Sequence, residues 1–79
     1  MRIPRDLPGH ALARALCASW GYREMHQSGS HIILDTDEPT HQRLSVPNHA
    51  TLRLGTLNGL LRLVANHKGI SREDILKTL

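Results

Sequence analysis

Two stretches with helical periodicity enclose a stretch with strand periodicity, and this order restricts the possible fold more than any other feature of the chain. In both outer stretches apolar residues recur at intervals of three or four, which places them on one face of a helix. The first set is Ala11, Leu12, Ala15, Leu16 and Trp20, and the second is Leu57, Leu60, Leu61 and Val64. The sequence therefore predicts two amphipathic helices that flank a sheet.

Turn signals divide the middle of the chain into three strands. Residues 22–27 form a short first strand, and Ser28-Gly29 supplies a tight turn after it. The acidic and proline-containing segment 35–39 is a polar turn after the second strand, and Pro47 ends the third. The third strand is marked by the alternating pair Leu44 and Val46.

The second strand predicts how the sheet is covered. Ile32 and Leu34 share one face, which leaves His31 and Ile33 on the other. Because the strands are grouped between helices, we expect an antiparallel sheet with the helices on one face and the other face open. The fold class is α+β, with the order α-β-β-β-α.

Helix-end signals complete this outline. Pro8 suits the first position of the first helix, Gly55 and Thr56 open the second, and Gly69 suits its left-handed end. Ser71, with acidic residues after it, caps a short terminal helix. That helix is expected to bury Ile75, Leu76 and Leu79.

Size and composition restrict the class of protein. A chain of 79 residues forms one domain, residues 1–79, and any active site in it should be a shallow groove. Phe is absent, so the core must be aliphatic. The chain has a single cysteine, Cys17, which excludes an internal disulfide. Cys17 falls within the first predicted helix and is expected to be a small core or boundary residue. Without a secretion signal or an apolar run of membrane-spanning length, we expect a cytoplasmic protein without a membrane partner.

The charge distribution indicates an anionic partner. The formal net charge is +3, and most of the basic residues are arginine, whose planar fork suits bidentate contacts to phosphate. Between Pro39 and Arg72 no acidic residue occurs. The two aromatic residues, Trp20 and Tyr22, are too few for a base-stacking platform and are expected to hold the first helix to the sheet.

Several short motifs in a fixed order resemble the HicA (YcfA-like) family over nearly the whole chain. They are Arg14-Ala15-Leu16, Gly21 with an aromatic residue beside it, Gly29-Ser30-His31, Val46-Pro47 followed by His49, Gly55-Thr56-Leu57, and Gly69-Ile70-Ser71-Arg72-Glu73. The resemblance implies a small toxin of a type II toxin-antitoxin system with a fold like that of double-stranded-RNA-binding domains. It implies an mRNA interferase, that is, an endoribonuclease, which a HicB antitoxin neutralises. The catalytic residue of that family is the histidine of the Gly-Ser-His motif, here His31.

The chemistry of RNA makes this role for His31 reasonable. RNA carries its own nucleophile, the 2′-hydroxyl, so a neutral imidazole can remove its proton and an imidazolium can protonate the leaving oxygen. No metal and no cofactor is then required. A surface histidine beside a turn is the ordinary alternative for His31.

A single imidazole cannot be base and acid at once, so a second proton carrier or phosphate contact is expected. His49 is the first candidate, because the family often has a histidine after Val-Pro. His26, across the turn from His31, is the second. A solvated loop histidine and an outward strand histidine are the respective alternatives.

Phosphate contacts are expected from residues elsewhere in the chain, because it lacks a basic residue that is frequent in the family. Many members carry a basic residue directly before the Gly-Ser-His motif, where this chain has Ser28. The free N–H groups of Gly55-Thr56 at a helix start suit one phosphate, although simple helix initiation explains them equally. The candidate RNA-binding side chains are Ser30, Arg23, Arg43 and Arg53, each of which also suits an ordinary surface position.

The sequence is also compatible with two other functions. The same fold could bind double-stranded RNA by shape, without catalysis, or its open sheet face could pair with another protein chain. A zinc site is disfavoured, because the six histidines and one cysteine lack closely spaced ligand pairs.

Overall fold

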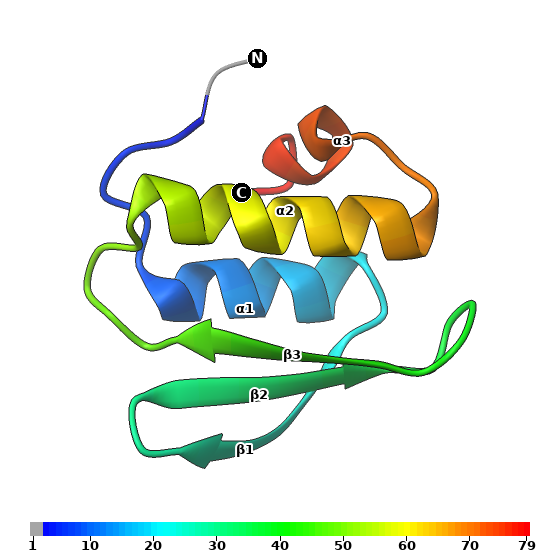
Figure 1. Cartoon of the computed structure of the whole chain (residues 1–79), viewed down its shortest axis with the longest axis horizontal. Helices are drawn as coiled ribbons and strands as arrows, with labels where there is room; N and C mark the ends of the chain where they lie inside the picture. Colours follow the sequence, from blue (N-terminus) through cyan, green and yellow to red (C-terminus); the bar gives the residue numbers. More distant parts are fainter. Residues whose placement is uncertain (1–2) are drawn as a thin grey trace.

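The elements follow the predicted α-β-β-β-α order, with a short helix at the end (Figure 1). The structure is a computed structural model that describes residues 3–79. Its elements are α1 (Gly9–Ser19), β1 (Arg23–Ser28), β2 (His31–Thr36), β3 (Gln42–Pro47), α2 (Leu54–Lys68) and α3 (Arg72–Leu76). The predicted α+β class is confirmed.

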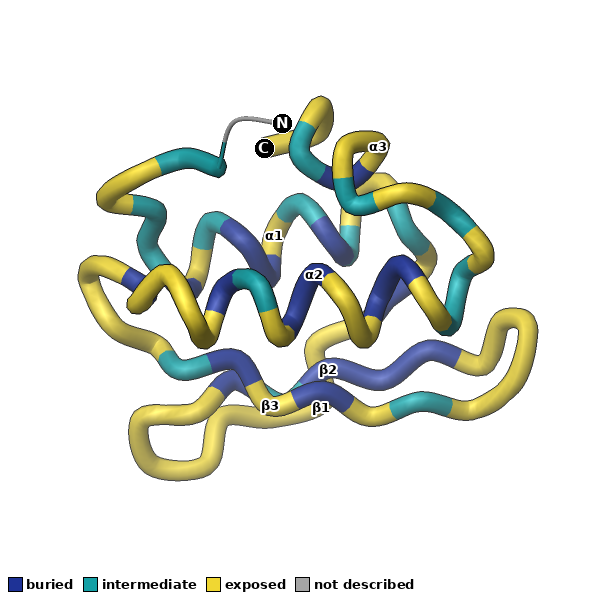
Figure 2. The backbone as a smooth tube through the Cα atoms, turned by 45° about the horizontal axis from the view of Figure 1, so that its top comes forward, coloured by how far each residue is buried: buried dark blue, intermediate teal, exposed yellow. Residues whose placement is uncertain are grey.

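The sheet has one covered and one open face, as predicted. Its strand order is β1-β2-β3, with β2 antiparallel to both neighbours. Helices α1 and α2 lie side by side on one face of the sheet, and α3 packs against α2 (Figures 1 and 2). The central strand β2 is therefore held on both edges and along one face.

The core is mainly aliphatic, with Tyr22 as an aromatic member, and lies between the helices and the strands β2 and β3. Its fully buried side chains include Leu34 and Val46 from the sheet, with Leu12, Leu16, Leu57 and Leu61 from the helices. By contrast, all six residues of β1 are exposed, and Figure 2 shows β1 and its turn in the colour of exposed residues. The helices thus leave the β1 edge and the open face accessible.

Strand pairing arranges the open face as rows of side chains that run across the sheet. Directly paired residues on antiparallel strands point to the same side. From the β1–β2 turn, the first row is Ser28, His31 and Pro47, the second is His26, Ile33 and Ser45, and the third is Arg23, Asp35 and Arg43.

A bulge in β1 decides which residue of that strand joins the second row. The register shifts between Glu24 and His26, which leaves Met25 as the extra residue. Simple alternation from Arg23 would turn Met25 toward the open face and His26 away from it. The bulge instead places His26 on the open face, beside Ile33.

The helix starts differ slightly from the prediction. Pro8 is the N-cap of α1 and not its first helical residue, because its backbone is extended and the N–H of Gly9 donates to the carbonyl of His49. Helix α2 begins at Leu54, one residue before the predicted Gly55-Thr56 opening, with Arg53 as N-cap.

The helix ends follow the prediction more closely. Gly69 takes the left-handed conformation after α2, with φ of 69°. Ser71 caps α3 in a reciprocal capping box with Asp74. The expected burial of Leu79 is wrong: α3 ends at Leu76, Ile75 fills the core, and Leu79 remains 38% exposed.

Asp35 also departs from the prediction. We expected a polar turn from this residue onward, but β2 continues through Thr36, and both side chains are buried. The ammonium of Lys68 donates to Thr36 Oγ1 over 2.9 Å and lies 4.8 Å from the centroid of the Tyr22 ring. These contacts hold the end of the sheet that is remote from His31.

The two aromatic residues have separate roles. Tyr22 is buried and its hydroxyl donates to the side chain of Gln42, so it connects the segment after α1 to β3, as expected. Trp20 does not bind the sheet in this way. Its indole N–H donates to Thr78 Oγ1 over 3.2 Å and so fixes the C-terminal end of the chain against α1.

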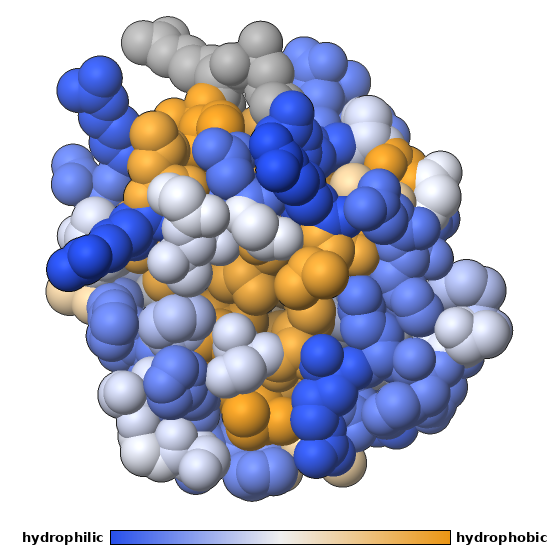
Figure 3. All heavy atoms as spheres, in the orientation of Figure 1, coloured by the Kyte–Doolittle hydropathy of each residue, from blue (hydrophilic) through white to orange (hydrophobic). Residues whose placement is uncertain are grey.

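Apolar side chains are also exposed on the helical side. Figure 3 shows them gathered in the middle of the face over the helices, with hydrophilic side chains around them. Of the large apolar side chains that are more than a third exposed, Leu54, Leu63 and Leu79 lie outside the sheet, whereas Met25 belongs to β1. Within residues 3–79, none of the helices has the length and apolarity needed to cross a membrane.

Gly9 allows the start of α1 to pack closely against the end of β3. A Cβ atom on Gly9 would overlap the carbonyl oxygen of Pro47 and lie 2.9 Å from its carbonyl carbon. The same approach permits the hydrogen bond of 2.9 Å from the N–H of Gly9 to His49. A glycine is therefore required here to fix the loop that follows the first row.

We expect Gly9→Ala to destabilise the fold by about 1–3 kcal/mol, because the added methyl group must displace the backbone at Pro47. Gly59→Ala is the matched control: Gly59 lies within α2 and a Cβ there meets nothing within 4 Å. Its greater helix propensity should stabilise the protein by about 0.5–1 kcal/mol. Urea unfolding measures the change in unfolding free energy for both variants. Equal changes would contradict the close approach of Gly9 to Pro47.

Candidate active site

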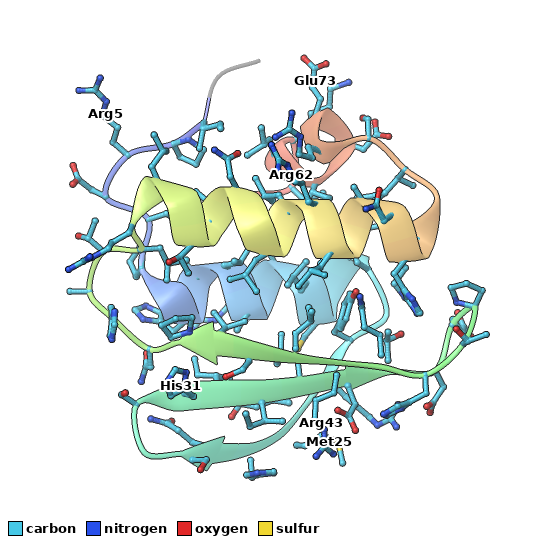
Figure 4. All side chains as sticks on the ribbon, in the orientation of Figure 1. Arg5, Met25, His31, Arg43, Arg62 and Glu73 are labelled. Atoms are coloured by element: carbon cyan, nitrogen blue, oxygen red, sulfur yellow. The ribbon has the colours of Figure 1, made fainter. Side chains whose placement is uncertain are left out.

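His31 is the first residue of β2 and lies at one end of the open face. Its side chain is exposed, and Figure 4 shows it next to the β1–β2 turn, far along the sheet from Arg43. The end of β3 and the N-termini of α1 and α2 lie at this same end of the molecule (Figure 1). The predicted open position of His31 is confirmed.

The turn before His31 shows what the first two residues of the Gly29-Ser30-His31 motif do in the structure. Gly29 has a φ of 58°, a left-handed conformation that a side chain disfavours. The carbonyl of Ser30 accepts the N–H of Asn48 over 2.6 Å, so the loop after β3 is fixed to this turn. Ser30 is exposed in the turn and directly precedes His31.

Ser45, which no sequence motif singles out, contacts the His31 ring. Ser45 Oγ lies 3.1 Å from His31 Nδ1, a distance that fits a hydrogen bond. The two residues occupy adjacent rows on neighbouring strands. The only available signal was the strand alternation, which turns Ser45 away from the buried Leu44 and Val46.

The two candidate partners of His31 occupy different surroundings. His26 lies in the second row, diagonal to His31 on the same face. Diagonal neighbours in a sheet are about 7–8 Å apart, close enough for both rings to approach one phosphate. His49 is exposed in the loop two residues beyond Pro47, and its backbone carbonyl is bound by Gly9.

Two of the predicted RNA-binding arginines are engaged in ion pairs. Arg43 contacts Asp35 through Nε at 2.8 Å and Nη2 at 3.1 Å, in a bidentate pair. The hydrogen bond from Arg43 holds the pKa of the Asp35 carboxyl below its ordinary value. Arg23 donates to Asp37 over 2.9 Å. Their guanidinium charges are therefore largely compensated.

A second carboxylate extends this charged end of the sheet. Asp37 accepts from Arg23 and lies 3.3 Å from His41 Nδ1, and these two contacts lower its pKa, Arg23 more than His41. These side chains are exposed, in contrast to Asp35. The charged cluster is separate from His31, because the second row lies between them.

Arg53 remains available at the end of the molecule that carries His31. It is exposed, its side chain caps no backbone N–H, and within residues 3–79 it forms no ion pair. The first hydrogen bond of α2 runs from the N–H of Leu57 to Arg53. The preceding N–H groups, which include Gly55 and Thr56, are therefore free to bind an anion.

Neither the acidic residues nor the thiol adds a further reactive centre. Within residues 3–79 there is no group of three or more His, Cys, Asp or Glu side chains that could hold a metal ion. Cys17 is half-buried, and burial, with a smaller effect of Glu24, raises the pKa of its thiol. It is a boundary residue, as predicted.

Comparison with known families places most of the chain in a described family. A family model described as "HicA toxin of bacterial toxin-antitoxin" matches residues 10–65. The matched region includes nearly all of α1, the complete sheet and most of α2, and therefore all three rows of the open face. Comparisons with curated proteins and with solved structures give no match.

We expect Arg43→Gln to lower the free energy of unfolding at neutral pH, because the buried Asp35 carboxylate then loses its partner. The folded-state pKa of Asp35 lies below the ordinary value of 3.8. Stabilisation by the pair is therefore complete above that pH and is lost as the pH falls through the lowered pKa.

Urea unfolding of both proteins from neutral pH to about pH 2 measures this difference. The difference in unfolding free energy between the wild type and Arg43→Gln should become smaller in acid. Arg53→Gln, which removes an arginine without an ion pair, is the control. A difference between wild type and Arg43→Gln that is the same at every pH would show that Arg43 acts through packing.

Proposed function

The chain belongs to the HicA toxin family of bacterial toxin-antitoxin systems, and from this premise we propose that it is an endoribonuclease, an mRNA interferase, with His31 as its acid/base residue. The observation that carries this proposal is the state of the His31 ring. It is exposed on a paired central strand, and within residues 3–79 only its Nδ1 is engaged, by Ser45. Nε2 is left for a substrate on the open face.

The proposed reaction uses the 2′-hydroxyl of the substrate as nucleophile. His31 Nε2 removes the proton of that hydroxyl, the oxygen attacks the adjacent phosphorus, and a 2′,3′-cyclic phosphate forms as the bond to the 5′-oxygen breaks. A second group donates a proton to that leaving oxygen. Attack by the 2′-hydroxyl needs no metal-activated water, so the reaction is metal-independent and uses no cofactor.

We assign the second proton transfer to His26 before His49. His26 shares the open face with His31 and is one row away, at a separation that one phosphate can bridge. His49 lies on the loop beyond β3, where it is better placed to contact a neighbouring phosphate. This reverses the order in which the sequence ranked them.

Arg53 and the N-terminus of α2 are the best available phosphate contacts. They lie at the end of the molecule that carries His31, and Arg53 has no carboxylate partner within residues 3–79. Ser30, exposed and directly before His31 in the chain, is a further candidate contact. Arg23 and Arg43 contact RNA only as members of their ion pairs with Asp37 and Asp35.

The proposed partner is a HicB-like antitoxin that covers the open face. A standard interface of about 800 Å² per partner would cover about a sixth of the 4799 Å² surface of this domain. An acidic antitoxin surface would replace RNA phosphates at Arg53 and the α2 N-terminus, and opposite charge would accelerate the encounter. Because the proposed substrate is mRNA, the proposed location of the protein is the cytoplasm.

We expect His31→Ala to reduce single-turnover RNA cleavage by about a hundredfold or more, because general acid–base catalysis contributes that much. The unfolding free energy should change by less than about 0.5 kcal/mol, since the side chain is exposed. The assay is run in a metal chelator, with His10→Ala, an exposed histidine on α1, as the matched control.

The same assay with His26→Ala and His49→Ala decides which residue makes the second proton transfer. The variant with the larger loss of cleavage rate identifies that residue. Full activity of His31→Ala would contradict the proposal. If the wild type binds RNA and does not cleave it, the protein is instead a non-catalytic RNA-binding module.

We expect a cognate antitoxin to protect β2, β3 and the β1–β2 turn from hydrogen exchange in the complex, because direct inhibition requires that His31 be covered. The measurement compares amide exchange of the free protein and the complex. Protection restricted to residues 71–79, with cleavage still inhibited, would show that the antitoxin acts indirectly.

A further inference from the structure

The His31 ring has one hydrogen-bond partner within residues 3–79, and that partner is Ser45. The serine lies on β3 in the row next to His31, and both side chains are exposed on the open face. Both residues belong to regular paired strands, so the backbone beneath each is fixed. Ser45 Oγ and His31 Nδ1 are 3.1 Å apart.

The proposed chemistry determines the direction of this hydrogen bond. A hydroxyl can either donate to Nδ1 or accept from it. If Ser45 donates, the neutral ring carries its proton on Nε2 and cannot act as a base there. If Nδ1–H donates to Ser45 Oγ, Nε2 has a free lone pair on the side of the ring away from the sheet.

The same bond persists after proton transfer. Once Nε2 has taken a proton, both ring nitrogens are donors, and Nδ1–H still donates to Ser45 Oγ. The serine therefore accepts a hydrogen bond in both protonation states that catalysis requires. A neutral hydroxyl fulfils the role that a carboxylate or a backbone carbonyl has beside many other catalytic histidines.

We propose that Ser45 is a positioning residue that holds the His31 ring with the proton on Nδ1 and with Nε2 turned toward the RNA. This inference rests on the proposed function of His31. Ser45 does not touch the reacting atoms. It restricts the rotation of the ring and selects the tautomer that can act as a base.

Ser45→Ala should lower the single-turnover cleavage rate at saturating RNA by about tenfold, the effect of one lost hydrogen bond. The RNA concentration at half-maximal rate should not change, because Ser45 is not a phosphate contact. Ser45→Thr keeps the hydroxyl and suits a strand, so it should restore most of the rate.

Ser28→Ala is the matched control. Ser28 flanks His31 on the opposite strand in the first row, and no hydrogen bond joins its hydroxyl to the ring within the described chain. It should therefore leave the rate unchanged. Equal losses in Ser28→Ala and Ser45→Ala, or no rescue by Ser45→Thr, would overturn the proposal.

A measurement of the tautomer tests the inference without reference to activity. In proton–nitrogen correlation spectra at alkaline pH, the His31 ring is identified by the signals that His31→Ala lacks. The wild type and Ser45→Thr should carry the proton on Nδ1, and Ser45→Ala should shift it toward Nε2. The same tautomer in wild type and Ser45→Ala would overturn the proposal.

The two experiments separate this inference from the proposed function. If His31→Ala abolishes cleavage while Ser45→Ala alters neither rate nor tautomer, the ribonuclease assignment stands and the role of Ser45 is wrong. If the wild type does not cleave RNA but the tautomer depends on Ser45, the proposed function fails and the predicted ring orientation is supported.

Discussion

The position of every candidate catalytic group depends on the register of β2 between its two neighbours. Ile32 and Leu34 are buried beneath the helices, and this burial places the alternate residues of the strand on the open face. A slip of one residue would turn His31 into the core and expose the core residues, at the cost of several apolar side chains. The apolar contacts that stabilise the domain therefore also fix the ring from which the proposed chemistry proceeds.

Contacts at both ends of the sheet support this register. At the His31 end, Gly9 packs against Pro47 and the loop beyond it, which connects the start of α1 to the last residue of the first row. At the other end, Lys68 bonds to the buried Thr36. Between them the Asp35–Arg43 pair lies on the open face, and the second row separates it from His31. The arrangement separates this self-compensated charged region from the end of the sheet that carries His31.

The sequence predicted the helices, the three strands and the exposure of His31 well, because apolar periodicity is a local signal. It failed where the outcome depends on residues that are distant in the chain. The burial of Asp35 requires Arg43 on the next strand, and the contact of Ser45 with His31 spans fourteen positions. The bulge at Met25, which turns His26 to the open face, has no signature in the alternation. The family resemblance identified His31, whereas only the structure shows what holds its ring.

The central claim is that His31 activates the 2′-hydroxyl of the RNA for attack on the adjacent phosphate. The most direct test compares single-turnover cleavage of one RNA oligonucleotide with that of the same oligonucleotide carrying a single 2′-deoxyribose at the cleaved position. The account predicts that the all-RNA strand yields a 2′,3′-cyclic phosphate and a 5′-hydroxyl, and that the substituted strand is bound but not cleaved there. Cleavage of the substituted strand at the same position, with a 5′-phosphate product, would show that water is the nucleophile and would contradict the account.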